Sequence, residues 1–190
     1  DYFDILQESD DVFRIAIGDV SGKGTTAAFY MAEVKGIFHA LSLMGANPME
    51  FVTYANQAIA KCFQKGFFFT LTYLQLDLKK RKLEMIRAGH RPAFFYKKAT
   101  DTIGIHREGT LGLGLVRDDS YKKYVKEAEV IAFEEGDFMV LYTDGIIEAR
   151  NKNDDEYGYD RFQKVLEDNK EADPDDISSA IMDSVHEFAG

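Results

Sequence analysis

The stretch that decides the fold class of this chain is Val12-Phe13-Arg14-Ile15-Ala16-Ile17-Gly18-Asp19-Val20-Ser21-Gly22-Lys23-Gly24. Its apolar residues Phe13, Ile15 and Ile17 lie at every second position, and this period of two predicts a strand. Three glycines surround the end of that strand and predict a tight turn after Asp19. The stretch therefore predicts a strand that presents a carboxylate at the edge of a sheet.

Two helices are predicted after this turn. Apolar residues recur at helical spacing over residues 27–41, which indicates a long amphipathic helix. A second helix is predicted to begin at Asn47, because Pro48 follows at the first helical position and Glu50 is placed to complete a capping box. Cys62 lies on the apolar stripe of this second helix and is predicted to be a buried thiol rather than a nucleophile.

The rest of the chain changes to strand patterns and then returns to helices. Apolar runs bounded by glycine or charged turns predict strands at residues 67–76, 83–87, 93–96, 103–106, 130–133 and 138–142. Helical patterns cover residues 160–168 and the segment from Asp173 onward. This order predicts an α+β fold with antiparallel sheets. Strict alternation of strands and helices is absent, which argues against a doubly wound Rossmann-type sheet.

The composition excludes several classes of protein. The chain of 190 residues has 33 acidic and 23 basic residues, a net charge of −10, which argues against a nucleic-acid-binding surface. The excess lies in residues 127–190, which hold 19 acidic and 5 basic residues. A single cysteine excludes an internal disulfide, fits a reducing compartment and predicts a cytoplasmic protein. No apolar run is long enough to span a membrane, and no signal peptide is visible.

The residues of chemical interest are aspartates that lie at strand ends beside glycine. Asp19 follows one predicted strand, and Asp144 with Gly145 follows another. Carboxylates fixed in this way suit Mg²⁺ or Mn²⁺, which prefer a few oxygen ligands and retain waters. Any one of these pairs taken alone is more typical of a simple turn. A P-loop is excluded, because the glycine spacing is one residue short and no Ser or Thr follows Lys23.

His90 is the one histidine with a separate hypothesis. It lies in the loop Ala88-Gly89-His90-Arg91-Pro92, between two predicted strands. The favoured interpretation is a structural histidine that bonds loop carbonyls, and a place in the functional site is the alternative.

Taken in order, the motifs of the chain resemble those of the SpoIIE/RsbU branch of the metal-dependent PPM (protein phosphatase 2C) serine/threonine phosphatases. The resemblance covers nearly the whole chain. The motifs that carry it are Asp1-Tyr2-Phe3-Asp4, residues 18–24, Phe69-Thr70-Leu71, Leu76-Asp77, residues 88–92, residues 111–114, Gly136-Asp137 and residues 141–149.

The resemblance implies a two-sheet antiparallel β-sandwich flanked by helices, with two Mn²⁺ or Mg²⁺ ions at one edge. It implies that Asp19 bridges the metals, that the backbone carbonyl of Val20 helps to hold one of them, and that Asp144 and Asp1 are further ligands. Asp4 is a weaker candidate beside them. No side chain is the nucleophile in such enzymes, since a metal-bound water attacks the phosphoserine or phosphothreonine directly.

Three further residues, Gly145, His90 and Arg91, are candidates for places around the metals or at the substrate. The family usually ends in an Asp-Asp-Ile-Thr motif that leads into a last strand. Here Asp175-Asp176 follows Pro174 and precedes a helical stripe, so we interpret it as a helix start, where acidic residues are favoured. Residues 1–190 are therefore expected to form a single phosphatase domain that is truncated at both ends and lacks its last strand or strands.

The resemblance also implies partners. The expected substrate is a phosphoprotein, by analogy a STAS-type anti-sigma antagonist, and a sensor or receiver domain is expected upstream in the same polypeptide. A homodimer is a further expectation, and the first two helices would be regulatory. The alternative function is a metal-poor pseudophosphatase that acts as a signalling interaction or dimerisation module.

Overall fold

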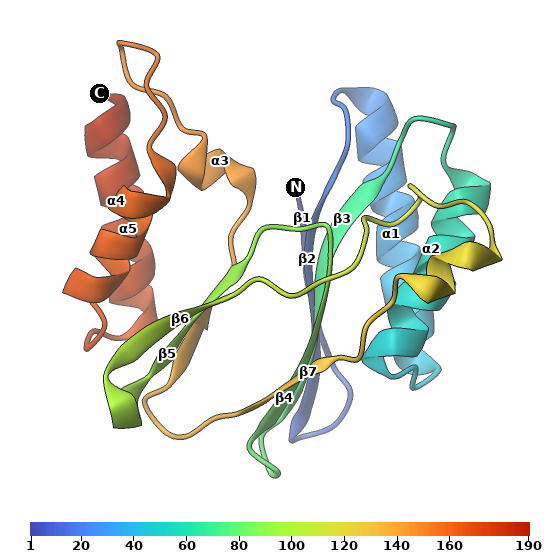
Figure 1. Ribbon diagram of the computed structural model, residues 1–190, viewed down its shortest axis with the longest axis horizontal. Coiled ribbons are helices and arrows are strands. Elements are labelled where there is room, and N and C mark those ends of the chain that lie inside the picture. The colour runs from blue at the N-terminus through green and yellow to red at the C-terminus, as the bar shows by residue number, and fades with distance from the viewer. The chain divides into compact units, whose positions relative to one another are not determined.

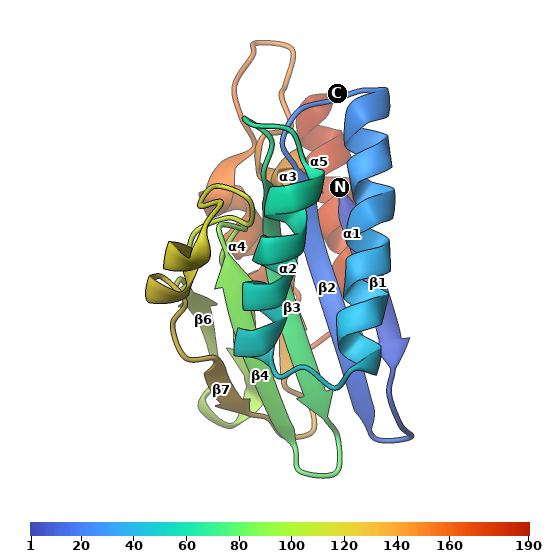
Figure 2. The same ribbon diagram turned by 90° about the vertical axis from the view of Figure 1, so that its right-hand side faces the viewer.

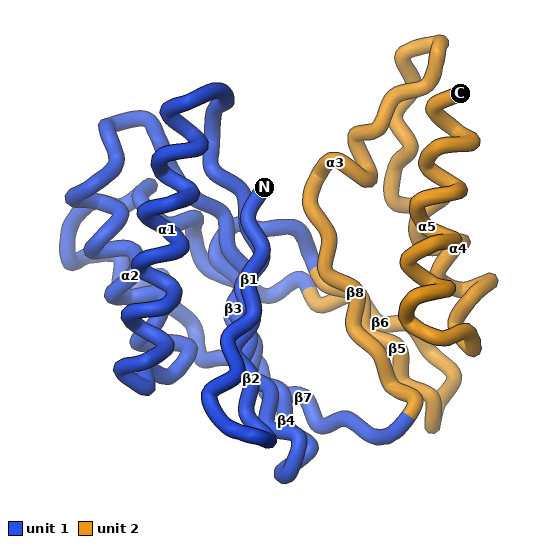
Figure 3. Tube along the Cα trace, turned by 180° about the vertical axis from the view of Figure 1, so that it is seen from behind, with its two compact units in different colours: residues 1–92, 107–135 blue, residues 93–106, 136–190 orange.

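The computed structural model describes all residues from 1 to 190, and the chain forms two compact units (Figure 3). The first unit consists of residues 1–92 and 107–135, and the second of residues 93–106 and 136–190. We describe each unit by itself. None of the helices combines the length and the apolar character that crossing a lipid bilayer would require.

The first unit is built on a five-stranded antiparallel sheet with the strand order β1-β2-β3-β4-β7. Its strands are β1 (Tyr2–Gln7), β2 (Val12–Val20), β3 (Phe69–Asp77), β4 (Lys82–Ala88) and β7 (Glu129–Ala132). The predicted strand that ends near Asp19 is confirmed, as is the predicted hairpin, which is formed by β3 and β4. A short 3-10 helix, η2 (Asp119–Lys123), precedes β7.

Two helices, α1 (Thr25–Leu43) and α2 (Pro48–Cys62), cover one face of this sheet (Figure 2). The predicted start of α2 is confirmed. Asn47 Oδ1 accepts a hydrogen bond from the Glu50 amide, and Glu50 Oε2 accepts one from the Asn47 amide, both at 3.0 Å. This reciprocal capping box satisfies two amides that the first turn of a helix leaves without intrahelical partners.

The core of the first unit lies between the helices and the even-numbered face of β2. Ala16 and Val20 are buried on that face, whereas Phe13 and Ile15 on the other face are partly exposed. Arg14 is only 2% exposed and donates hydrogen bonds to Glu8 Oε2, Ala46 O and Tyr73 OH at 2.7, 2.6 and 2.7 Å. Its charge is therefore paired and its donors are directed to fixed acceptors, which is the condition for burying a guanidinium.

The prediction that Cys62 is a buried thiol is wrong, because its side chain is exposed. Cys62 is the last residue of α2, and the backbone turns to an extended conformation at Phe63. Phe63 is 2% exposed and stacks on Tyr30, with 4.0 Å between the ring centroids. The helical spacing predicts that residue 62 is buried, but the residue buried in the core here is Phe63.

The second unit contains a three-stranded antiparallel sheet with the order β6-β5-β8 and a layer of helices (Figure 1). Its elements are β5 (Ala93–Lys97), the 3-10 helix η1 (Lys98–Thr100), β6 (Thr102–His106), β8 (Phe138–Val140), α3 (Asp144–Ile147), α4 (Gly158–Asp168) and α5 (Pro174–Ala189). Asp175 and Asp176 lie in the first turn of α5, which confirms their interpretation as a helix start. The two sheets with their helices make the chain α+β, as predicted.

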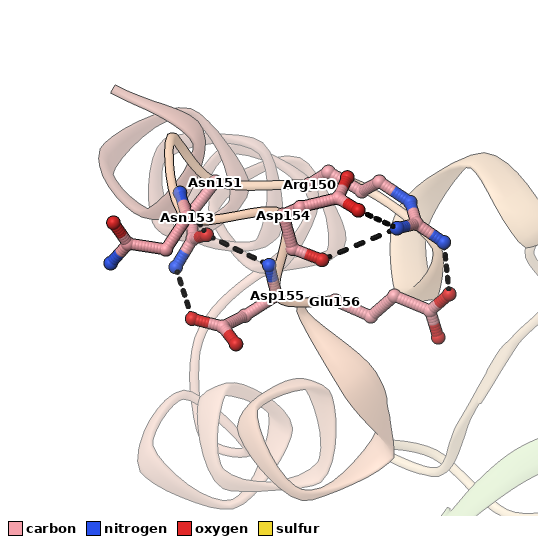
Figure 4. Close-up of polar contacts among 6 residues, drawn as sticks. All are labelled: Arg150, Asn151, Asn153, Asp154, Asp155 and Glu156. Atoms are coloured by element: carbon pink, nitrogen blue, oxygen red, sulfur yellow. Dashed lines mark hydrogen bonds and ion pairs between the residues drawn. The ribbon is translucent and has the colours of Figure 1, made fainter.

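A polar loop over residues 150–156 connects α3 to α4 in the second unit (Figure 4). Asn151 Oδ1 accepts hydrogen bonds from the amides of Asn153 and Asp155, both at 2.9 Å, and Asn151 Nδ2 donates to Asp155 Oδ2 at 3.1 Å. Arg150 forms ion pairs with Asp154 and Glu156, each at 2.9 Å. A single asparagine side chain therefore holds the turn of this loop.

We expect Asn151→Ala to lower the free energy of unfolding by about 1 kcal/mol, because two loop amides lose their acceptor. The measurement is urea unfolding followed by circular dichroism. Asn153→Ala is the matched control and should change the free energy by less than about 0.5 kcal/mol, since the Asn153 side chain is exposed and points away from the loop (Figure 4). Equal losses in the two variants would contradict the role of Asn151.

Candidate functional site

Asp19 lies at the end of β2, opposite Thr70 on β3. The Asp19 amide donates a hydrogen bond to Thr70 Oγ1 at 3.2 Å. The Thr70 hydroxyl in turn donates a hydrogen bond to the Asp19 carbonyl oxygen at 3.3 Å. The Asp19 side chain is 35% exposed. The backbone of this residue is thus fixed by a neighbouring strand while its carboxylate remains open to solvent.

The residue before Asp19 must be a glycine. A Cβ atom on Gly18 would lie 2.1 Å from the Thr70 carbonyl oxygen and 2.5 Å from the Phe69 ring. Real Cβ atoms do not approach other heavy atoms so closely, and one of the obstructing atoms is backbone. The glycine therefore permits the close approach of β2 and β3 on which the position of Asp19 depends.

Asp1 is brought to Asp19 by the pairing of β1 with β2, in which Tyr2 lies opposite Gly18. The carboxylates of Asp1 and Asp19 each offer an oxygen within 4.8 Å of the other. Two hard oxygen donors at a partly exposed strand end fit a divalent metal.

Val20 has its side chain in the core of the first unit, where it is 2% exposed. The strands remain paired just beyond it, because the Ser21 amide donates to the Phe68 carbonyl and Ser21 Oγ accepts from the Phe68 amide, both at 2.9 Å. The backbone at Val20 is therefore held rigidly. The expected role of its carbonyl as a metal ligand stays a prediction.

His90 is 5% exposed, and its Nδ1 lies 3.0 Å from Thr70 Oγ1. The contact joins this ring nitrogen to a side-chain hydroxyl on β3. Gly89 has a φ of +71°, and a Cβ atom there would meet the Gly112 amide nitrogen at 2.9 Å. The glycine motifs at residues 88–92 and 111–114 thus pack backbone to backbone in the first unit.

Sequence reasoning missed Arg87, which organises the loop around His90. Its guanidinium donates hydrogen bonds to the carbonyl oxygens of His90, Arg107 and Glu108. These acceptors lie up to 21 positions away in the sequence. An arginine at the end of a strand carries no local signal for such contacts. Arg91, the neighbouring candidate, is partly buried in the same loop.

Asp4 ties β1 to α1. Its Oδ2 accepts hydrogen bonds from Lys35 Nζ at 2.7 Å and Tyr2 OH at 3.1 Å, and it lies 3.0 Å from His39 Nε2. Burial alone would raise the pKa of Asp4, but the hydrogen bonds from Lys35, His39 and Tyr2 together lower the pKa below its ordinary value. Asp4 therefore stays ionised at neutral pH and anchors the helix that follows Asp19.

Asp144 and Gly145 belong to the second unit, in the first turn of α3. Thr143 caps this helix with extended backbone angles, and the Asp144 carbonyl accepts a hydrogen bond from the Glu148 amide at 2.8 Å. A Cβ atom on Gly145 would meet only Thr143 Oγ1, at 3.9 Å. The sequence predicts a strand over residues 138–142, but β8 ends at Val140, and the short helix puts Asp144 at a helix start. The ligand role of Asp144 stays a prediction.

The chain is similar to proteins of known sequence and structure. It is 28% identical over 185 residues to the phosphoserine phosphatase RsbU of Bacillus subtilis, an alignment that covers 97% of this chain and 53% of RsbU. Its fold matches the SiaA-PP2C domain of Pseudomonas aeruginosa with a TM-score of 0.83 at 16% identity, covering 100% of this chain and 74% of that one. RsbX, solved in complex with magnesium, matches with a TM-score of 0.69 at 14% identity, covering 98% and 78%.

These likenesses cover 97–100% of the chain. The structural matches show a PP2C-type fold, and the chain spans about half the length of RsbU. The family model described as "Stage II sporulation protein E (SpoIIE)" matches residues 9–190, nearly all of the sequence. The chain therefore belongs to the SpoIIE family, within the RsbU-like branch of the PPM phosphatases.

Proposed function

We propose that this chain is a PPM-type phosphatase that hydrolyses phosphoserine or phosphothreonine on a regulatory protein, with divalent metal ions as cofactors. The observation that carries the proposal is the pair of carboxylates, Asp1 and Asp19, at adjacent strand ends of a SpoIIE-family chain. The partial exposure of the Asp19 side chain supports a site that takes cations from solvent.

The residues that would hold two Mn²⁺ or Mg²⁺ ions are Asp1, Asp19, Asp144 and the backbone carbonyl of Val20. Such ions supply Lewis acidity, which lowers the pKa of a water and neutralises phosphate charge. The magnesium bound to RsbX, a protein of the same fold, supports this choice of cofactor.

The residues of this chain contribute position and charge. Asp19 offers a carboxylate on a backbone that β3 holds in place, so little reorganisation is needed when a cation binds. Asp4 keeps α1 attached to β1, the strand that follows Asp1. We assign Arg91 to the substrate side, because a guanidinium can bind a phosphate oxygen in a bidentate manner.

The substrate class and partners follow from the family. We propose a phosphorylated STAS-type antagonist as the substrate and a sensor or receiver domain in the same polypeptide as the regulator. Relatives such as RsbU are roughly twice as long as this chain, which supports additional regulatory sequence in the whole protein. A homodimer stays a prediction, and its measurement is the mass in solution by light scattering.

The proposal is tested by phosphate release from a phosphoserine-containing STAS-type protein. We expect release with Mn²⁺, none with excess EDTA, and recovery when Mn²⁺ is added back, because the carboxylates alone provide no nucleophile. Calorimetry with Mn²⁺ accompanies the assay. A chain that folds normally but binds no Mn²⁺ would favour the alternative function, a pseudophosphatase that acts as an interaction module.

A further inference from the structure

One side-chain hydroxyl lies at the centre of the contacts around Asp19. Thr70 Oγ1 is 3.2 Å from the Asp19 amide nitrogen, 3.3 Å from the Asp19 carbonyl oxygen and 3.0 Å from His90 Nδ1. All three groups lie in the first unit. The hydroxyl therefore contacts both backbone polar groups of Asp19 and one nitrogen of a buried imidazole.

A single arrangement of protons satisfies these three contacts. A hydroxyl has one proton to donate and two lone pairs that accept. Thr70 can accept from the Asp19 amide and from His90 Nδ1–H while it donates to the Asp19 carbonyl. If the hydroxyl donated to His90 instead, the Asp19 carbonyl would lose this donor. With its proton on Nδ1, His90 therefore donates to Thr70 Oγ1, and the hydroxyl proton is directed to the Asp19 carbonyl oxygen.

The imidazole is itself held in place. His90 is 5% exposed, its carbonyl oxygen accepts a hydrogen bond from Arg87, and the preceding Gly89 packs against Gly112. The backbone of His90 therefore has little freedom to carry the ring away from Thr70. The chain of contacts runs from this rigid loop, through one hydroxyl, to the backbone of Asp19.

We propose that Thr70 and His90 are positioning residues for Asp19 and that they set the affinity of the site for divalent cations without binding the cation themselves. This inference rests on the proposed function, in which Asp19 is a metal ligand. Asp19 is the second-last residue of β2. Groups that orient a metal ligand typically change metal affinity 10- to 100-fold when they are removed.

The same strand supplies a matched control. Thr72 is two residues further along β3, on the same face as Thr70, and it is 0% exposed. Its hydroxyl has no hydrogen-bond partner. Thr72→Val therefore repeats the chemistry of Thr70→Val in the same sheet but removes no contact to Asp19.

The experiment measures Mn²⁺ binding by calorimetry and amide hydrogen exchange at Asp19 by NMR, on the full chain. We expect Thr70→Val to weaken Mn²⁺ binding about tenfold and to speed exchange at the Asp19 amide. Thr70→Ser keeps the hydroxyl and should bind like the wild type, as should Thr72→Val. His90→Asn retains a polar atom near the position of Nδ1 and should bind more tightly than His90→Leu.

Equal Mn²⁺ affinity and equal Asp19 exchange in Thr70→Val and Thr72→Val would overturn the positioning role. The exchange measurement is made without metal, so it decides the positioning role even if the wild type binds no Mn²⁺. A wild type that binds no Mn²⁺ would contradict the proposed function and would leave the positioning role to be decided by the exchange measurement. If Thr70→Val does not fold, the comparison of His90→Leu with His90→Asn gives the same decision, since equal affinity and exchange in that pair would overturn the proposal.

Discussion

Asp19→Asn is expected to reduce Mn²⁺-dependent phosphate release by more than about 100-fold, because changes to groups that merely orient a metal ligand already cost 10- to 100-fold. The substitution keeps the size of the side chain and removes its negative charge. Asn offers one neutral carbonyl oxygen, which cannot bridge two cations as a carboxylate can. Calorimetry should show a matching loss of Mn²⁺ affinity.

The fold should survive this substitution. The hydrogen bonds that fix residue 19 involve its backbone and Thr70, and these remain in the variant. The Asp19 side chain is 35% exposed, and substitutions of such side chains usually change the free energy of unfolding by less than about 0.5 kcal/mol. The free energy of unfolding of Asp19→Asn, measured in EDTA, should therefore be close to that of the wild type. Full activity in Asp19→Asn would contradict the ligand role assigned to Asp19.

Gly18→Ala is expected to have the largest effect on stability, a loss of about 3 kcal/mol in the free energy of unfolding. The new Cβ atom would lie 2.1 Å from the Thr70 carbonyl oxygen, so β2 and β3 must separate. The separation also moves Asp19 away from the Thr70 hydroxyl, and Mn²⁺ affinity should fall in the folded fraction. Urea unfolding and calorimetry measure the two effects.

Gly36→Ala is the control for this variant. Gly36 lies in the interior of α1 and is exposed, and a Cβ atom at this position would meet no heavy atom within 4 Å. Alanine in an exposed helix interior is favoured over glycine by about 0.5–1 kcal/mol, so this variant should be slightly more stable than the wild type. A Gly18→Ala protein as stable as Gly36→Ala would contradict the close packing of β2 on β3.

Local patterns predicted the elements of the fold well, because their causes are local. The alternation around Ile15 gives β2, and the Asn47 capping box with Pro48 gives the start of α2. The acidic residues after Pro174 were correctly interpreted as the start of a helix, α5. The prediction failed at Cys62, where the helix ends and the next residue, Phe63, turns into the core.

The sequence by itself determined the order of the motifs, the α+β class and the aspartates at strand ends, since these depend on spacing along the chain. Only the tertiary structure decided which groups hold Asp19. Thr70 and His90 lie 51 and 71 positions from Asp19, and they meet because β2 pairs with β3 and the loop at Gly89 folds back along β3. Hydrogen bonds of this kind join residues that are close in space but far apart in the sequence, so the periodicity of the sequence cannot predict them.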